Sequence, residues 1–284
     1  MYIRAFYCCV SLFLVAAGVL AQSPQDNDHV SYLEMAQQAY NTKNYDLALY
    51  AYNQVAFTNY PQIDPSVQLE IGKCYLAKGD FDQAGAFFDR SYFSSMLKSQ
   101  QQEAILLKSR ALIGQQKYPL ALSELYSLDT SMLIHSHRAS YYLFKGVCLF
   151  EMQQFEAAEA SFLALVSDSN HIQSLFASPK RFNRPSSTMA LLLSAIVPGS
   201  GQLYAKEYRE AGNSFLINSV FVFYYLRIFN LYGPIDAFIA VLPWFQRYYV
   251  GGYNKASLLG YEKMLANRKS ILAGILADIE KQNP

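Results

Sequence analysis

A short pattern returns four times along the first half of the chain, and this recurrence constrains the fold more than any other feature. Each copy ends in an alanine, and successive alanines are 36, 37 and 37 residues apart. An aromatic residue stands three positions before each alanine, and a bulky apolar residue stands four positions after it. A fixed period of this length predicts a stack of similar helical units. The alanines are Ala48, Ala84, Ala121 and Ala158, the aromatic residues are Tyr45, Phe81, Tyr118 and Phe155, and the bulky residues are Tyr52, Phe88, Leu125 and Phe162.

Each unit contains two segments with helical period, and the second segment follows the aromatic residue. A small residue at one fixed place in each first segment lets paired helices approach closely. These features resemble the tetratricopeptide repeat (TPR), a helix–turn–helix of about 34 residues. The resemblance covers residues 31–170, and it departs from the family in two or three extra residues per unit and in Ile105, where an aromatic residue is missing. The small residues are Ala36, Gly72, Ser109 and Gly146.

The TPR resemblance implies an all-α helical solenoid whose concave surface binds a protein or peptide partner. Lys73 and Arg110 fall at the same position in successive units. We expect them to hold a carboxylate or an acidic segment, and the alternative is that they are solvated surface cations. The residues expected to line the groove are Gln37, Tyr40, Asn41, Lys73, Glu103, Arg110, Phe150 and Glu151.

Two further sets of residues recur at fixed positions. Cys74 and Cys148 each stand ten residues before a repeat alanine, so they occupy equivalent positions two units apart. That separation is too large for a disulfide, and we expect both to be unbridged and buried. A recurring leucine is either an apolar stripe in the groove or part of the core between units, and the core is favoured. The leucines are Leu33, Leu69, Leu106 and Leu143.

The N-terminus is typical of a targeting segment. Residues 1–21 combine Arg4 with an apolar run, and Val19 and Ala21 fit a small-residue cleavage site. This pattern predicts a secretory signal peptide that is cleaved before Gln22, followed by a linker over residues 22–30. The alternative is an uncleaved signal anchor.

Charge divides the chain into two parts. Residues 22–178 carry 10 basic and 16 acidic side chains, whereas residues 179–284 carry 12 basic and 6 acidic ones. The whole chain has a net charge of +1, so the basic field of a nucleic-acid-binding protein is absent. A basic and apolar C-terminal part favours contact with membrane lipid.

The C-terminal part is predicted to be a membrane module. A basic linker over residues 171–187 precedes apolar stretches at 185–205, 211–226 and 235–250, and the module is expected over residues 188–252. If all three stretches cross the membrane, the cations of the tail lie in the cytoplasm; if the first is re-entrant, the tail lies on the side of the repeats. Residues 253–284 have the period of an amphipathic helix, which lies on a membrane or a partner, or folds onto its own domain.

The first apolar stretch is interrupted by a P-G-x-G-Q-x-Y run, which resembles a motif of small bacterial membrane hairpin proteins. A proline and two glycines permit a turn or a close approach of helices. The glutamine and the tyrosine are suited to satisfy backbone groups that the break leaves free. The motif residues are Pro198, Gly199, Gly201, Gln202 and Tyr204.

The sequence contains no paired acids, metal-ligand spacing or cofactor motif. His135 and His137 have no carboxylate or cysteine at ligand spacing, and a helix end or loop is expected there. Ser200 lacks the context of a catalytic nucleophile. We therefore expect a protein that is not an enzyme, with no cofactor and no metal.

Together these patterns predict a non-catalytic TPR scaffold or adaptor at the bacterial cell envelope. It is tethered to the inner membrane, and its TPR domain is exported to the periplasm. The alternative is a subunit of a membrane transport or envelope assembly complex, in which the TPR domain is a regulatory or docking element.

Overall fold

The protein is helical wherever its structure is described. The computed structural model describes residues 25–58 and 64–282, and these form thirteen α-helices, one 3-10 helix and no strand. The predicted signal peptide lies outside the described residues. The chain divides into two compact units between Gln154 and Phe155, which is inside the fourth predicted repeat.

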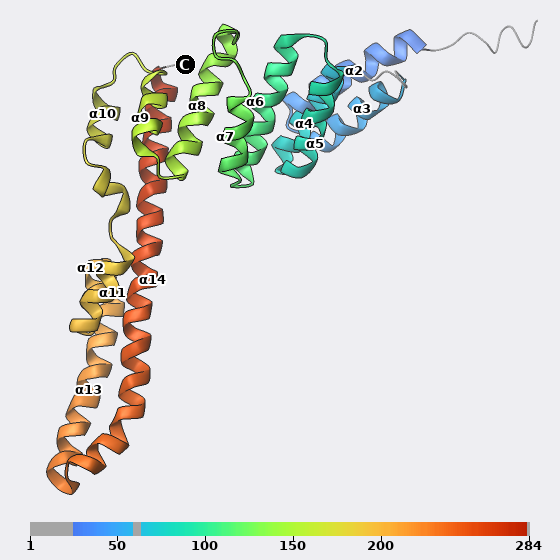
Figure 1. Ribbon diagram of the computed structural model, residues 1–284. Coiled ribbons are helices and arrows are strands. Elements are labelled where there is room, and N and C mark those ends of the chain that lie inside the picture. Colours follow the sequence, from blue (N-terminus) through green and yellow to red (C-terminus); the bar gives the residue numbers. More distant parts are fainter. Residues whose placement is uncertain (1–24, 59–63, 283–284) are drawn as a thin grey trace, which may run out of the picture. The chain divides into compact units, whose positions relative to one another are not determined.

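The first unit is a row of helices in which each packs against the next (Figure 1). Helix α4 also contacts α6, and α6 contacts α8, so alternate helices form a layer of their own. This is the packing of stacked helix pairs. The helices are α2 (Gln25–Asn41), α3 (Tyr45–Thr58), α4 (Pro65–Lys78), α5 (Phe81–Ser94), α6 (Lys98–Gly114), α7 (Tyr118–Tyr126) and α8 (His135–Glu151).

The recurring positions of the sequence build the core. All four repeat alanines and the four bulky residues that follow them are buried, and so are the four small residues of the first segments. A Cβ atom on Gly72 would lie 2.5 Å from the ring of Phe88, so this pair of helices requires a glycine at that contact. The prediction that small residues permit close helix packing is confirmed here.

One turn geometry recurs between the paired helices. The residue two positions before each repeat aromatic is left-handed, with φ of 61° at Lys43, 82° at Gly79, 60° at Gln116 and 63° at Gln153. Its N–H donates to the carbonyl three residues earlier, and the next N–H donates to the carbonyl five residues earlier, as in Lys43 to Tyr40 and Asn44 to Ala39. This is the Schellman ending of a helix. It explains why each second helix begins at the aromatic residue.

The two cysteines are free and fully buried, as expected. Burial raises the pKa of each thiol to about 12, because the interior disfavours a thiolate. Leu69 and Leu106 are buried in the core as favoured, whereas Leu33 and Leu143 are half-buried.

The second unit is built along one long helix, α14 (Figure 1). Helices α11, α12 and α13 and the 3-10 helix η1 pack on it. Its elements are α9 (Phe155–Leu163), α10 (Asn170–Phe176), η1 (Pro179–Asn183), α11 (Ser187–Ile196), α12 (Ser200–Tyr204), α13 (Tyr208–Tyr232) and α14 (Pro234–Gln282).

Two expectations for this unit are corrected. The first apolar stretch is not one spanning helix, since α11 has 10 residues and a length of about 15 Å. No helix boundary separates the membrane module from the tail, because α14 is continuous over 49 residues. The Ser167 N–H donates to the Gln282 side chain and His171 pairs with Asp278, so the last part of the tail folds onto its own unit.

The Schellman turns predict opposite effects for the same substitution at two glycines of the first unit. Gly79→Ala should lower the free energy of unfolding by about 1–2 kcal/mol, because the new side chain is forced into the left-handed region. Gly85→Ala, inside α5 and with no atom near the added Cβ, should raise it by about 0.5–1 kcal/mol. Denaturant unfolding of the full chain in detergent measures both changes, and equal signs would contradict the assigned turn.

Candidate functional site

The predicted groove residues differ in their accessibility. Gln37, Asn41 and Arg110 are exposed, and most of the others are half-buried. Phe150 is an exception, because only 1% of it is exposed. The prediction that it lines a groove is therefore corrected, because Phe150 is buried and does not reach the surface. The half-buried members are Tyr40, Lys73, Glu103 and Glu151.

Lys73 is not a free cation. Its Nζ lies 2.8 Å from Glu70 on its own helix and 2.9 Å from Glu103 on α6. Burial alone would lower the pKa of Lys73, but hydrogen bonds to the two carboxylates outweigh it and raise the pKa. Lys73 therefore ties α4 to α6. Arg110 is exposed and has no ion pair among the described residues. Of the two aligned cations, Lys73 and Arg110, it is therefore the one available to a partner.

Sequence reasoning missed a second bridging lysine. The Nζ of Lys108 on α6 lies 2.7 Å from Asp89 on α5 and 2.8 Å from Glu124 on α7. No spacing rule pointed to it, because its partners come from different helices. Lys108 joins three consecutive helices of the row.

The P-G-x-G-Q-x-Y motif forms the contact between α11 and α12. Gly199 is left-handed, with φ of 94°, and precedes α12. A Cβ atom on Gly201 would lie 1.8 Å from the carbonyl oxygen of Ala190 on α11. The motif therefore needs its glycines for a tight turn and for contact between two helix backbones.

A buried chain of hydrogen bonds runs through the motif to α14. The Ser194 hydroxyl accepts from the Gly201 N–H at 2.9 Å and donates to Oε1 of Gln202 at 2.7 Å. Nε2 of Gln202, which is 1% exposed, donates to the Gly252 carbonyl at 2.8 Å. The Tyr204 hydroxyl accepts from the Ser186 N–H at 3.3 Å. Gln202 and Tyr204 thus bond to backbone groups of α14 and of the residue before α11, and not, as was predicted, to groups that the break at the motif leaves free. Ser194 is a member that the sequence did not reveal.

Helix α13 and the part of α14 that packs against it form a hairpin, residues 208–255. The two run antiparallel, because Glu210 pairs with Lys255 near one end and the rings of Phe221 and Tyr248 are in contact further along. Between them lies an apolar cavity of about 230 Å³, lined by residues such as Phe221 and Phe245.

The outer surface of this hairpin is apolar and exposed. Among the described residues, α13 is the helix that is long and apolar enough to cross a membrane, and 6% of its most apolar stretch is buried within the protein. Phe223 is 65% exposed and Ile239 is 67% exposed. An exposed apolar surface of this extent marks an interaction site.

The described residues contain no group of three potential metal ligands. His135 is the first residue of α8, which agrees with the expected helix end. The Ser200 hydroxyl donates to the Val197 carbonyl at 2.8 Å. The chain matches no known protein family, no curated protein and no solved structure at a significant level.

The motif contact predicts that Gly201→Ala separates α12 from α11. The added Cβ meets a backbone carbonyl that cannot rotate away, so we expect a loss of about 2 kcal/mol or more in unfolding free energy. Gly212→Ala on α13 is the matched control, because nothing lies within 4 Å of its Cβ. Thermal unfolding of the detergent-solubilised chain compares them, and equal stability of the two variants would refute the close contact.

Proposed function

We propose that the protein is a non-catalytic scaffold of TPR-like repeats that is tethered to a bacterial inner membrane and holds a protein partner beside it. The exposed apolar surface of the hairpin is the observation that supports the tether. The partner-binding role is supported by the stacked helix pairs of the first unit, whose turns and buried positions repeat.

The dimensions of the hairpin suit a bilayer. Helix α13 has 25 residues and is about 37 Å long, which exceeds the hydrocarbon core of about 30 Å. Helix α14 returns alongside it, and because both segments are helical, their backbone groups bond within the helices except where Pro243 in α14 lacks an N–H. Trp244 and Tyr232 are exposed aromatic residues of the type that membrane interfaces favour.

Exposed apolar side chains of the first unit support a binding role. Phe57 is 80% exposed and Phe93 is 82% exposed, and both stand nine residues after a repeat alanine. Exposed aromatic residues are frequent anchors in protein interfaces. Arg110 adds a cation without an internal partner.

We propose that the repeats are exported to the periplasm. With α13 and α14 crossing as a hairpin, both ends of the hairpin lie on the side of the repeats. The cations at that end, such as Lys206, Arg209 and Lys263, favour the cytoplasm by the positive-inside tendency. The predicted signal peptide favours the opposite orientation, with the repeats exported. It enters the membrane first, and the first segment to enter usually sets the orientation of the chain. An export-dependent reporter fused after Gln282 tests this side directly, and an inactive reporter would place the repeats in the cytoplasm.

The tether predicts that charges on the hairpin release the protein from membranes. Phe223→Arg together with Ile239→Arg should abolish retention after a carbonate wash, because each charge at the bilayer centre costs about 2.5–3.5 kcal/mol. Phe93→Arg is the control, since it charges an equally exposed aromatic residue of the first unit. Retention of the double variant would exclude the hairpin as the tether.

The scaffold role predicts that Arg110→Glu weakens capture of the partner from solubilised membranes by about tenfold, because it reverses a charge-assisted contact. Its melting temperature should not change, since the side chain is exposed. Lys98→Glu, an exposed lysine on the same helix, is the matched control.

Two outcomes would argue against this function. Equal capture by the Arg110 and Lys98 variants would remove Arg110 from the binding surface. Loss of capture in the hairpin variant, with Arg110→Glu unaffected, would favour a subunit of a transport or assembly complex whose partner contacts the hairpin.

A further inference from the structure

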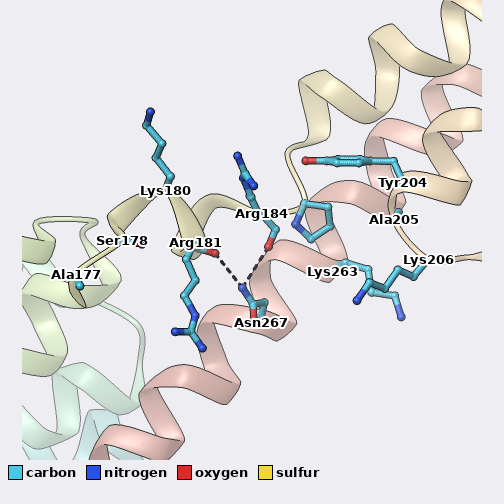
Figure 2. A pocket seen from close by; sticks show the side chains of 11 residues that line it. Ala177, Ser178, Lys180, Arg181, Arg184, Tyr204, Ala205, Lys206, Lys263 and Asn267 are labelled. Atoms are coloured by element: carbon cyan, nitrogen blue, oxygen red, sulfur yellow. Dashed lines mark hydrogen bonds between the residues drawn. The ribbon is translucent and has the colours of Figure 1, made fainter. Parts of the chain in front are cut away.

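The second unit holds a basic cavity of about 900 Å³ (Figure 2). It lies between the segment that contains η1, the turn after α12, and α14. Among the described residues, its lining includes five cations and no carboxylate. The cations are Lys180, Arg181, Arg184, Lys206 and Lys263.

The basic segment is fixed in place by α14. Nδ2 of Asn267 donates to the carbonyls of Arg181 and Arg184, at 3.1 and 3.2 Å, as Figure 2 shows. Nε of Arg268 donates to the Phe182 carbonyl at 2.9 Å. Phe182 is fully buried, and its ring lies against Phe176. Because Phe182 is buried and α14 bonds to the backbone on both sides of it, the neighbouring Arg181 and Arg184 are held with exposed side chains.

The turn after α12 supplies a cation from the opposite wall. Lys206 is left-handed, with φ of 63°, and its N–H donates to the Leu203 carbonyl. Its side chain lines the cavity together with that of Lys263. Glu207 lies 2.8 Å from Lys263 and compensates one of these two charges. No acid among the described residues pairs with Lys206.

Four of the cations have no ion pair among the described residues, whereas Lys263 pairs with Glu207. The four are Lys180, Arg181, Arg184 and Lys206. Like charges around one cavity repel one another, and a bound anion relieves that repulsion. The Tyr204 hydroxyl also lines the cavity, and because it accepts from Ser186, its own proton remains for another acceptor. Lysine, arginine and a hydroxyl are the donors that suit phosphate oxygens.

We propose that this cavity binds an anionic phosphate group. Lys206 stands two residues before α13 begins, so the cavity lies at the end of the membrane hairpin, at the level where lipid headgroups are found. A phospholipid headgroup is one source of the phosphate and a soluble phosphate is the other. The lipid source rests on the proposed membrane tether, whereas phosphate binding does not.

The experiment titrates the full chain in detergent with phosphatidylglycerol, phosphatidylcholine or inorganic phosphate, and measures bound ligand by native mass spectrometry. The parent should bind phosphatidylglycerol or inorganic phosphate, and the triple variant Lys180→Gln, Arg184→Gln, Lys206→Gln should bind it about tenfold or more weakly. Neutralising these three side chains breaks no ion pair among the described residues. The control variant neutralises Lys98, Arg138 and Lys281, three exposed cations outside the cavity.

The ligands distinguish the two sources. Tight binding of phosphatidylglycerol, with weak binding of phosphatidylcholine and of inorganic phosphate, supports a lipid headgroup. Tight binding of inorganic phosphate alone supports a soluble ligand. The proposal would be overturned if neither phosphatidylglycerol nor inorganic phosphate bound. It would also be overturned if the triple variant and the control variant lost the same binding affinity. Because binding is measured in detergent, this result can be interpreted even if the membrane-retention test fails.

Discussion

The left-handed residue at the end of a helix is the constraint on which the rest of the fold depends. It reverses the chain in a fixed number of residues, so that a large side chain of one helix meets a small residue of the helix before it, as Phe88 meets Gly72. The left-handed conformation costs about 1–2 kcal/mol of conformational free energy in each of Lys43, Gln116 and Gln153, because these residues carry a Cβ atom. Gly79 has no Cβ and adopts it without this cost. Packing in the array must outweigh that cost.

The same reversal occurs a fifth time, in the second unit. Lys206 and Glu207 make the two hydrogen bonds of the Schellman ending, and α13 begins at Tyr208. Ala211 follows three residues later and is buried, and Phe215 stands four residues after it. This is the spacing of the four repeats, so the signal for a fifth reversal was present in the sequence. Phe215 differs from its counterparts because it is exposed.

What could be predicted from the sequence was set by local spacing. The recurring aromatic residue predicted the start of each second helix, and the two-unit separation of Cys74 and Cys148 predicted that they are free. Contacts between helices were not predictable in this way. Lys73 was expected to face a partner, yet Glu103, thirty residues along the chain, binds it. Phe150 was assigned to a surface because helical phase alone does not show which neighbour covers a side chain.

The long helix α14 has a mechanical consequence. It contains Pro243 near the hairpin end, and the part that follows the proline extends over about 58 Å and includes both residues that pack on α13 and Asn267 and Arg268. A tilt of about 10° of this part displaces its far end by about 10 Å. Under the proposed membrane tether, a change in the thickness or curvature of the bilayer would therefore reach the C-terminal end of α14 as a lever movement, without local unfolding in between.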